Sequence, residues 1–318
     1  MDEVKKKLIS IVTPCYNEED NIEELYRRIK AVISKLQIYE FEIIVIDNSS
    51  KDSTLEKLKK LALSDKTLKV IVNTRNFGHI RSPYYGILQS NGHATIYLAS
   101  DLQDPPELIA EFIKHWEVGH KLVMAVKPVS QESTWIHNLR KFYYRFVDQI
   151  TDITLLADST GFGLYDRVVI DQLRQINDPY PFLRGLICEL GYNIKTVAFD
   201  QPKRLRGITK NNFFSLYDIA MLGIISHSKL PIRIASFLGF LVGLLSIIAA
   251  ICYLILKLLF WDTIPFGFAP VVIGLFFLFG IQLIFIGILG EYISSIHTYV
   301  QRRPVVVEKE RINFINHE

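Results

Sequence analysis

Cysteine is scarce in this chain and occurs at three widely separated positions, Cys15, Cys188 and Cys252. No CxxC or Cys/His spacing is present, so a disulfide framework and a zinc site are both disfavoured and we expect reduced thiols. Neither GxGxxG nor GxxxxGK(S/T) occurs, which removes support for a dinucleotide fingerprint or a P-loop. The net charge of +3 over 318 residues provides no broad basic face and argues against nucleic acid as a partner.

Charged residues are also missing from two long apolar runs near the C-terminus, Ile234–Leu256 and Pro270–Gly290. A helix that crosses a bilayer needs roughly 20 apolar residues, so each run is long enough to span a membrane. The preceding part of the chain has the composition of a globular domain. The sequence therefore predicts a soluble domain tethered to lipid.

Basic residues at the edges of these runs predict the orientation. Lys229 and Arg233 precede the first run, and Arg302 and Arg303 follow the second, whereas the connecting loop Trp261–Ala269 has no Lys or Arg. The positive-inside bias places both flanks in the cytoplasm and the loop outside. We expect a multi-pass protein of the plasma (inner) membrane with a cytoplasmic soluble domain.

The soluble half alternates apolar runs with segments of helical spacing, which predicts an α/β fold with a mostly parallel sheet and helices on both faces. One helix is expected to start at a capping box formed by Ser53 and Glu56 and to run through Leu63. The other expected elements are the strands Leu8–Pro14, Phe41–Asp47, Leu68–Val72 and Ala94–Ala99 and the helices Asn21–Leu36 and Tyr84–Ser90.

Polar side chains follow the carboxyl end of each expected strand. Ligands of parallel sheets bind beyond these ends, so we expect the functional site there. The segments are Cys15–Glu18, Asp47–Ser50, Arg75–Gly78 and Ser100–Gln103.

The last of these segments contains two hard oxygen ligands, the Asp101 carboxylate and the Gln103 amide. Such ligands suit Mg²⁺ or Mn²⁺, which completes its shell with water and substrate phosphates. The alternative is a helix start, with Asp104 as N-cap, Pro105 at the first helical position and Glu107 at the third. We assign the helix start to those three residues and the metal to Asp101 and Gln103.

Two segments before the first apolar run suggest contact with the membrane surface. Lys203–Arg206 is basic and suits anionic headgroups or phosphates. Asn211–Ser226 has aromatic and aliphatic residues at helical spacing, which predicts an interfacial helix leading into the run. An ordinary domain helix with an aromatic core face is the alternative.

Four motifs together resemble family 2 glycosyltransferases, and more narrowly the polyprenyl-phosphate glycosyltransferases, such as dolichol-phosphate mannose synthase and bacterial enzymes that charge undecaprenyl phosphate with glucose. The likeness runs from about Leu8 to Arg303. It implies an A-type glycosyltransferase fold that binds a nucleotide-diphosphate sugar. The motifs are Thr13–Glu19, Asp47–Asp52, Arg75–Gly78 and Asp101–Glu107.

The resemblance also implies the nucleotide-binding residues. Pro14, Tyr16 and Glu18 would line the base and ribose, Asp47 would contact the base, and Lys127 would stand where the family has an Arg near the pyrophosphate. Each residue has an ordinary structural alternative: a strand-ending proline, a packed tyrosine, an acid at a helix start, a turn-forming aspartate and a solvated lysine.

A basic pattern before the membrane matches the segment in which the family contacts the donor diphosphate or the acceptor phosphate. Its residues are Arg204, Thr209 and Lys210, and the resemblance implies catalytic roles for Arg204 and Lys210 beside Asp101. Exposed surface charge is the alternative, although it explains the full Arg-x-x-Gly-x-Thr-Lys pattern less well.

The chain differs from the family at three positions. Ala99 replaces the first aspartate of an Asp-x-Asp metal motif, and Gly161 and Gly163 replace a charged pair in a Gly-Asp-Phe-Arg segment. These changes favour a weaker metal site and altered surroundings of the acceptor. They also permit an alternative reading, a non-catalytic or altered-acceptor membrane protein that binds nucleotide sugars.

The chemistry of the acceptor favours a lipid phosphate over a sugar hydroxyl. A phosphate monoester is mostly dianionic at neutral pH and needs positioning rather than a general base, and no acid after Gln103 is marked as such a base. The leading hypothesis is a membrane-anchored inverting hexosyltransferase that uses a nucleotide sugar, UDP favoured over GDP, and a polyprenyl phosphate. A homo-oligomer is left open, and a processive polysaccharide synthase is disfavoured because no Gln-x-x-Arg-Trp occurs.

This hypothesis divides the chain into four parts. Residues 1–200 form the nucleotide-sugar-binding domain, and 201–230 form the basic segment and interfacial helix. Residues 231–293 form two transmembrane helices with a short external loop, and 294–318 form a cytoplasmic tail.

Overall fold

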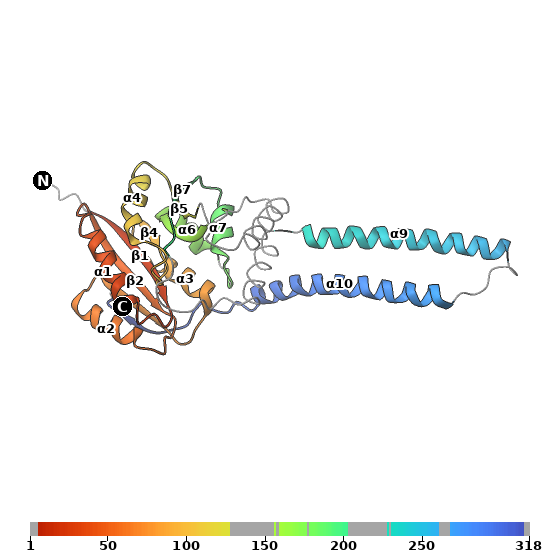
Figure 1. Cartoon of the computed structure of the whole chain (residues 1–318), viewed down its shortest axis with the longest axis horizontal. Helices are drawn as coiled ribbons and strands as arrows, with labels where there is room; N and C mark the ends of the chain where they lie inside the picture. Colours follow the sequence, from red (N-terminus) through yellow and green to blue (C-terminus); the bar gives the residue numbers. More distant parts are fainter. Residues whose placement is uncertain are drawn as a thin grey trace.

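The computed structural model describes residues 6–127, 156, 159–176, 178–202, 228, 230–260 and 268–314. They form an α/β domain from which two long helices extend (Figure 1). The strands are β1 (Lys7–Cys15), β2 (Tyr39–Asp47), β3 (Leu68–Asn73), β4 (Ala94–Tyr97), β5 (Leu122–Val126), β6 (Ser159–Asp166), β7 (Ile194–Ala198) and β8 (Glu308–Ile312). The helices are α1 (Ile22–Ile33), α2 (Thr54–Ser64), α3 (Gly78–Leu88), the 3₁₀ helix η1 (Pro106–Leu108), α4 (Ile109–Glu117), α6 (Arg167–Gln175), α7 (Leu183–Glu189), α9 (Leu230–Leu259) and α10 (Phe268–Val300).

The described strands form one sheet in the order β7-β5-β6-β4-β1-β2-β3-β8. The four strands predicted from the sequence, β1 to β4, form its parallel centre. The sheet is mixed, because β6 runs antiparallel to both β4 and β5 and β8 runs antiparallel to β3. The site expected at the carboxyl ends of the parallel strands is therefore bounded on one side by an antiparallel strand.

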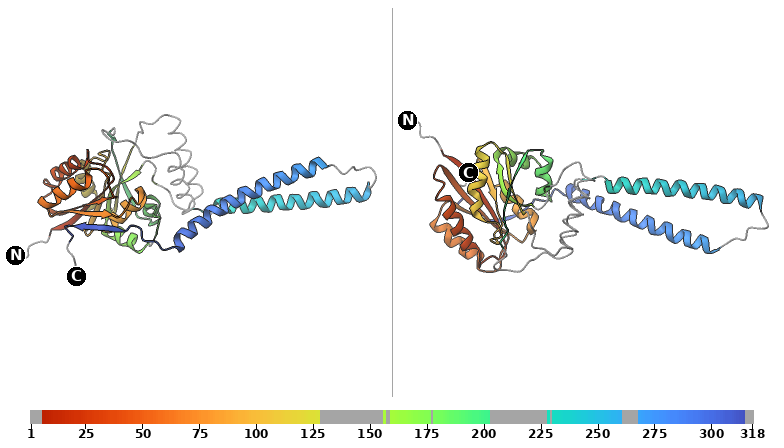
Figure 2. Two further views of the ribbon diagram at one scale, coloured as in Figure 1. Left: turned by 90° about the horizontal axis from the view of Figure 1, so that it is seen from below. Right: turned by 45° about the horizontal axis from the view of Figure 1, so that its top comes forward.

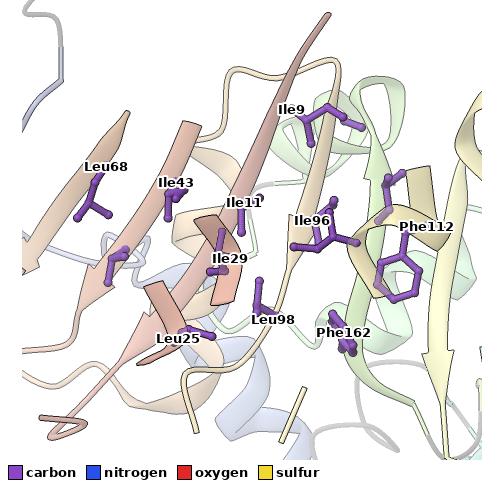
Figure 3. Close-up of a cluster of buried hydrophobic side chains, with 14 of the residues drawn as sticks. Ile9, Ile11, Leu25, Ile29, Ile43, Leu68, Ile96, Leu98, Phe112 and Phe162 are labelled. Atoms are coloured by element: carbon purple, nitrogen blue, oxygen red, sulfur yellow. The ribbon is translucent and has the colours of Figure 1, made fainter. Parts of the chain in front are cut away.

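Alternating side chains of the central strands supply two hydrophobic cores, one on each face of the sheet. Ile9 and Ile11 of β1 belong to the core beneath α1 and α4, where Figure 3 shows Leu25, Ile29 and Phe112 around them. The opposite face packs against α3, α6 and α7. Because both faces are covered, the strands contain the continuous apolar runs that made them predictable from the sequence.

The predicted capping box at the start of α2 is wrong. Ser53 occupies the N-cap position, but its side chain makes no capping hydrogen bond, and Glu56 pairs with Lys60 instead. The Asp52 carboxylate takes over, accepting hydrogen bonds from the Thr54 N–H at 3.1 Å and the Thr54 hydroxyl at 2.5 Å. An ionised acceptor satisfies the free N–H groups of the helix start better than a neutral hydroxyl.

Helices α9 and α10 extend away from the domain, as Figures 1 and 2 show. Within them, Leu230–Tyr253 and Gly274–Val300 have mean hydropathies of 2.6 and 2.0, with none of the most apolar window buried. Phe237 and Phe276 are 67% and 76% exposed. By length and composition both helices can cross a membrane.

The chain returns to the domain after α10. There β8 adds to the edge of the sheet, with Val70 of β3 opposite Ile312. Arg81 of α3 donates to the Pro304 carbonyl at 2.5 Å, and Tyr85 donates to the Glu308 carboxylate at 2.7 Å. The segment that we expected to be a tail thus contains the end of α10 and a strand of the sheet, which brings both ends of the helical pair to the domain side.

Candidate functional site

The ends of β1 and β2 bring four predicted nucleotide-binding residues to one edge of the sheet. Cys15 and Asp47 pair across the two strands, so Pro14 at the end of β1 and Tyr16 and Glu18 on the following loop lie beside Asp47. The Asp47 side chain is fully buried and accepts a hydrogen bond from the Ser50 N–H at 3.2 Å. Burial raises the pKa of Asp47, and the hydrogen bonds from Ser50 oppose that rise.

Hydrogen bonds hold this loop against the turn after β2. Asn17, which has a positive φ of 54°, donates its N–H to the Ser50 hydroxyl at 3.0 Å and accepts the Lys51 N–H at 2.8 Å. The Glu18 N–H donates to Thr54 at 2.9 Å. These contacts give the edge a fixed shape before any ligand is bound.

A network of asparagine amides, which the sequence does not reveal, extends the edge to β3. Asn48 donates to Asn76 at 2.9 Å and accepts from Asn73 and from the Phe77 N–H, both at 2.9 Å. It also donates to the Gly78 carbonyl at 3.2 Å. The sequence marked Arg75–Gly78 as a polar strand end, but it did not show that this segment would contact Asn48.

The loop after β4 holds the predicted metal ligands. Asp101 accepts the Gln103 N–H at 3.2 Å across Leu102, whose φ is +61°. The Gln103 amide donates to the Pro202 carbonyl at 3.4 Å. Both side chains are only partly buried, so their oxygens remain accessible to a cation.

Asp104 closes this loop instead of capping a helix, which corrects our expectation. Its buried carboxylate accepts the Ala99 N–H at 2.9 Å, and Pro105 occupies the N-cap position of η1. Burial, together with the Asp101 charge, raises the pKa of Asp104 to about 6, against the opposing effects of the Ala99 hydrogen bond and the Lys127 charge. Glu107 lies at the second position of η1 rather than the predicted third, still in the first turn, and pairs with Arg28 at 2.6 Å.

The donor set fits a divalent cation that keeps several outside ligands. Within the described residues no group of three or more His, Cys, Asp or Glu side chains is placed to hold a metal. Asp101 and Gln103 supply a carboxylate and an amide, and Ala99 supplies no ligand where the family has the first aspartate of the Asp-x-Asp motif. Mg²⁺ and Mn²⁺ tolerate such a site because water and phosphate oxygens complete the shell.

The remaining predicted residues fall into two groups. Lys127 follows β5, as expected, and its charge acts on the buried Asp104 carboxylate. Arg204, Thr209 and Lys210 lie outside the described residues, as do the expected interfacial helix 211–226 and most of the loop 261–269.

The backbone explains why glycine occupies the two positions, 161 and 163, at which the family has charged residues. Gly161 has a φ of +91°, a conformation that side chains with a Cβ rarely adopt. A Cβ on Gly163 would collide with the Val123 carbonyl and lie 3.0 Å from the Met124 Cα. A side chain is therefore excluded at Gly163 by backbone contact and disfavoured at Gly161 by backbone conformation alone.

A doubly covered α/β sheet with an acidic loop and polar strand ends is what an A-type glycosyltransferase domain is expected to have. Residues 10–174, more than half of the chain, match the family model described as glycosyl transferase family 2. The chain belongs to this family, and it is therefore a glycosyltransferase. The mixed sheet and the family membership together confirm the expected A-type domain.

Relatives of similar length match nearly the whole chain. A glycosyltransferase of Synechocystis is 37% identical over 298 residues, covering 93% of each chain. A prophage-derived bactoprenol glucosyl transferase of Shigella flexneri is 32% identical over 305 residues, covering 95% of this chain and 97% of that protein. A prophage bactoprenol glucosyl transferase homologue of Escherichia coli is 31% identical, with 95% and 98% covered.

Solved structures with detectable likeness are more distant. Glucosyl-3-phosphoglycerate synthase from Mycobacterium tuberculosis, in complex with Mn²⁺, UDP and phosphoglyceric acid, is 16% identical with a TM-score of 0.48, covering 69% of this chain and 76% of that one. A mannosyltransferase from Pyrobaculum calidifontis, in complex with GDP-mannose and Mn²⁺, is 18% identical with a TM-score of 0.43, covering 64% and 59%.

Proposed function

We propose that this glycosyltransferase is a membrane-anchored, inverting hexosyltransferase that moves a sugar from a nucleotide-diphosphate sugar to a polyprenyl phosphate on the cytoplasmic face. The observation that carries the proposal is the match to the Shigella bactoprenol glucosyl transferase over 95% of this chain. A match of that extent takes in both apolar helices as well as the domain.

The edge formed by β1, β2 and β3 supports a nucleotide site. Asp47 is buried with a raised pKa, and a carboxylate in such a place gains from a ligand N–H donor, such as that of a pyrimidine base. Pro14 ends the adjoining strand β1, and Tyr16 and Glu18 lie on the loop that follows it. We favour UDP over GDP as the nucleotide.

Asp101 and Gln103 would hold Mg²⁺ or Mn²⁺, which when bound neutralises charge on the departing nucleoside diphosphate. Lys127 stands beside the same loop and offers a point charge to the pyrophosphate. Arg204 and Lys210 are proposed to contact the diphosphate or the acceptor phosphate.

The described carboxylates at the strand ends support an acceptor that needs no general base. Asp47, Asp52 and Asp104 each hold a backbone N–H group, of Ser50, Thr54 and Ala99 respectively. Asp52 and Asp104 thus hold loop structure, and Asp47 keeps acceptor sites for the proposed nucleotide. A phosphate dianion can attack without losing a proton, whereas a sugar hydroxyl needs a base within hydrogen-bond reach.

Exposed apolar helices support the membrane anchor. Burying side chains such as Phe237 and Phe276 in lipid removes apolar surface from water at roughly 25 cal/mol per Å². Arg233, Arg302 and Arg303 flank the helices on the domain side, which favours a cytoplasmic domain in the inner membrane.

A transfer assay tests the proposal. Membranes containing the full chain are incubated with labelled UDP- and GDP-sugars and with undecaprenyl phosphate or undecaprenol, and the lipid fraction is extracted. We expect a labelled lipid only with the phosphate. Equal use of the alcohol, or label only on a soluble glycan, would refute the lipid-phosphate acceptor.

A second candidate is a nucleotide-sugar-binding protein without turnover. The observation that favours it is Ala99, which leaves the metal loop with a single carboxylate ligand. Tight nucleotide binding with no product from any donor in the same assay would select this candidate.

A further inference from the structure

An open cleft lies beside the metal loop and takes no part in the nucleotide site described above. It is bounded by the start of α3, the end of β4, the start of β6 and the segment leading into α7. Its polar lining comes from His79, Tyr97, Thr160 and Arg184, and its apolar lining includes Phe182 and Leu183. These residues are far apart in the sequence and only the fold brings them together.

Arg184 gives the cleft a positive charge. One of its guanidinium nitrogens donates to the Ser159 carbonyl at 3.1 Å, and the group lies 5.8 Å from the centroid of the Phe182 ring. Within the part of the chain that the structure describes, no carboxylate pairs with it. A guanidinium has five N–H donors, so most remain for an anionic ligand.

Two hydrogen-bonding side chains face the same space. Tyr97 is half-buried, and its hydroxyl makes no hydrogen bond within the described residues. Burial raises the pKa of Tyr97, with further contributions from Asp104 and Asp101, so the hydroxyl remains a donor. Desolvation and the Arg184 charge lower the pKa of His79, whereas the Arg184 guanidinium stays charged at all physiological pH.

Gly161 keeps the face of Tyr97 open. A Cβ at this position would lie 3.7 Å from the Tyr97 ring, so a larger side chain would occupy the cleft. Glycine at this position, where the family has a charged residue, therefore leaves room for a ligand beside Tyr97 in the cleft.

Both walls of the cleft are hydrogen-bonded to the domain-side end of α10 or to the segment that follows it. On one side, Asp178 accepts a hydrogen bond from Tyr299 of α10 at 3.0 Å, just before the segment that contains Phe182 and Arg184. On the other, Arg81 of α3 donates to Pro304. Figure 1 shows α3 and α7 on the side of the domain from which α9 and α10 extend.

We infer that this cleft binds the phosphate group of the lipid acceptor, with Arg184 as its counter-charge, Tyr97 as a hydrogen-bond donor, and Phe182 and Leu183 against the first isoprene units. The inference rests on the proposed function and identifies residues that the sequence did not. The phosphate oxygen bonds to the anomeric carbon as the bond from that carbon to the nucleoside diphosphate breaks. The electron pair leaves with the diphosphate, and the phosphate dianion has no proton to lose.

Steady-state kinetics of the full chain in detergent micelles test the inference. Arg184→Met should raise the KM for undecaprenyl phosphate by about 10- to 100-fold, the range expected for a lost hydrogen bond to a charged group. The KM for the nucleotide sugar should stay unchanged. Arg184→Lys should recover part of the loss, and Tyr97→Phe should raise the same KM by roughly 3- to 10-fold. Arg27→Met, which removes an exposed arginine of α1, is the control.

Three results would overturn the inference. The first is an unchanged lipid KM in both Arg184→Met and Tyr97→Phe. The second is an increase confined to the donor KM, which would assign the cleft to the transferred sugar. The third is an equal loss of affinity for undecaprenol.

A direct binding measurement separates this inference from the proposed function. If the wild-type chain makes no lipid-linked product, the proposed function fails, and binding of a short-chain prenyl phosphate is then titrated by fluorescence. Binding that is lost in Arg184→Met would support the cleft assignment on its own, and absence of binding to the wild-type chain would refute it.

Discussion

The Asp104 carboxylate accepts a hydrogen bond from the Ala99 N–H at 2.9 Å and thereby closes the loop that presents Asp101 and Gln103. From the sequence, we expected Asp104 to cap a helix and Ala99 to replace a metal ligand, with no contact between the two. This contact shows that Asp104 fixes the backbone conformation of the metal loop.

Asp104 should make stability depend on pH. Its folded-state pKa of about 6 lies above its ordinary value of 3.8, so between these values the folded form binds more protons and stability from this group falls as pH rises. The penalty at neutral pH is on the order of 3 kcal/mol. Asp104→Asn should therefore gain melting temperature relative to wild type as pH increases from 4 to 7, measured in EDTA. A pH-independent difference, equal to that of the control Asp171→Asn, would contradict the assignment.

Asp101 should be indispensable for turnover with a divalent metal. Asp101→Asn should lower kcat/KM by about 100-fold or more, because a metal-held charge contributes several kcal/mol to the transition state. Activity should also be lost in EDTA and return with Mn²⁺ or Mg²⁺. Ala99→Asp, which restores the usual second carboxylate, should keep activity or lower the Mn²⁺ concentration for half-maximal rate. Turnover insensitive to both EDTA and Asp101→Asn would rule out the metal role.

Gly163 should tolerate no side chain. Gly163→Ala should lower the melting temperature by an amount equivalent to about 1–3 kcal/mol, because its Cβ would meet the backbone of β5, and Gly163→Arg should lower it further. Gly243→Ala, at a position with no atom within 4 Å of the added Cβ, is the matched control. Equal stability of Gly163→Arg and wild type would show that the family's charged pair can be restored.

Cysteine labelling should report the orientation of the helical pair. In a background in which Cys15, Cys188 and Cys252 are replaced by alanine, Thr263→Cys should react with an impermeant thiol reagent added to intact cells. Asn316→Cys should react only after lysis, since the basic flanks favour the cytoplasm. Reaction of Asn316→Cys in intact cells would reverse the proposed topology.

One part of the candidate site could be predicted from sequence motifs, and another part is formed only when the chain folds. The polar strand ends were predictable because parallel strands place their carboxyl ends at one edge. The asparagine network around Asn48 and the cleft around Arg184 were not, because each joins residues from separate segments whose distances depend on the packing of α3, β4 and α7.

The amino-acid sequence by itself determined the four central strands, the family motifs and the two apolar helices. Strands buried on both faces need continuous apolar runs, and lipid-crossing helices need long ones, so composition alone carries these signals. Only the tertiary structure decided that the charged segment Glu308–Ile312 becomes β8 and that Ser159–Asp166 becomes β6. An edge strand with exposed side chains, and a glycine-containing strand packed against β5, acquire their conformation from the partner strand that satisfies their backbone hydrogen bonds.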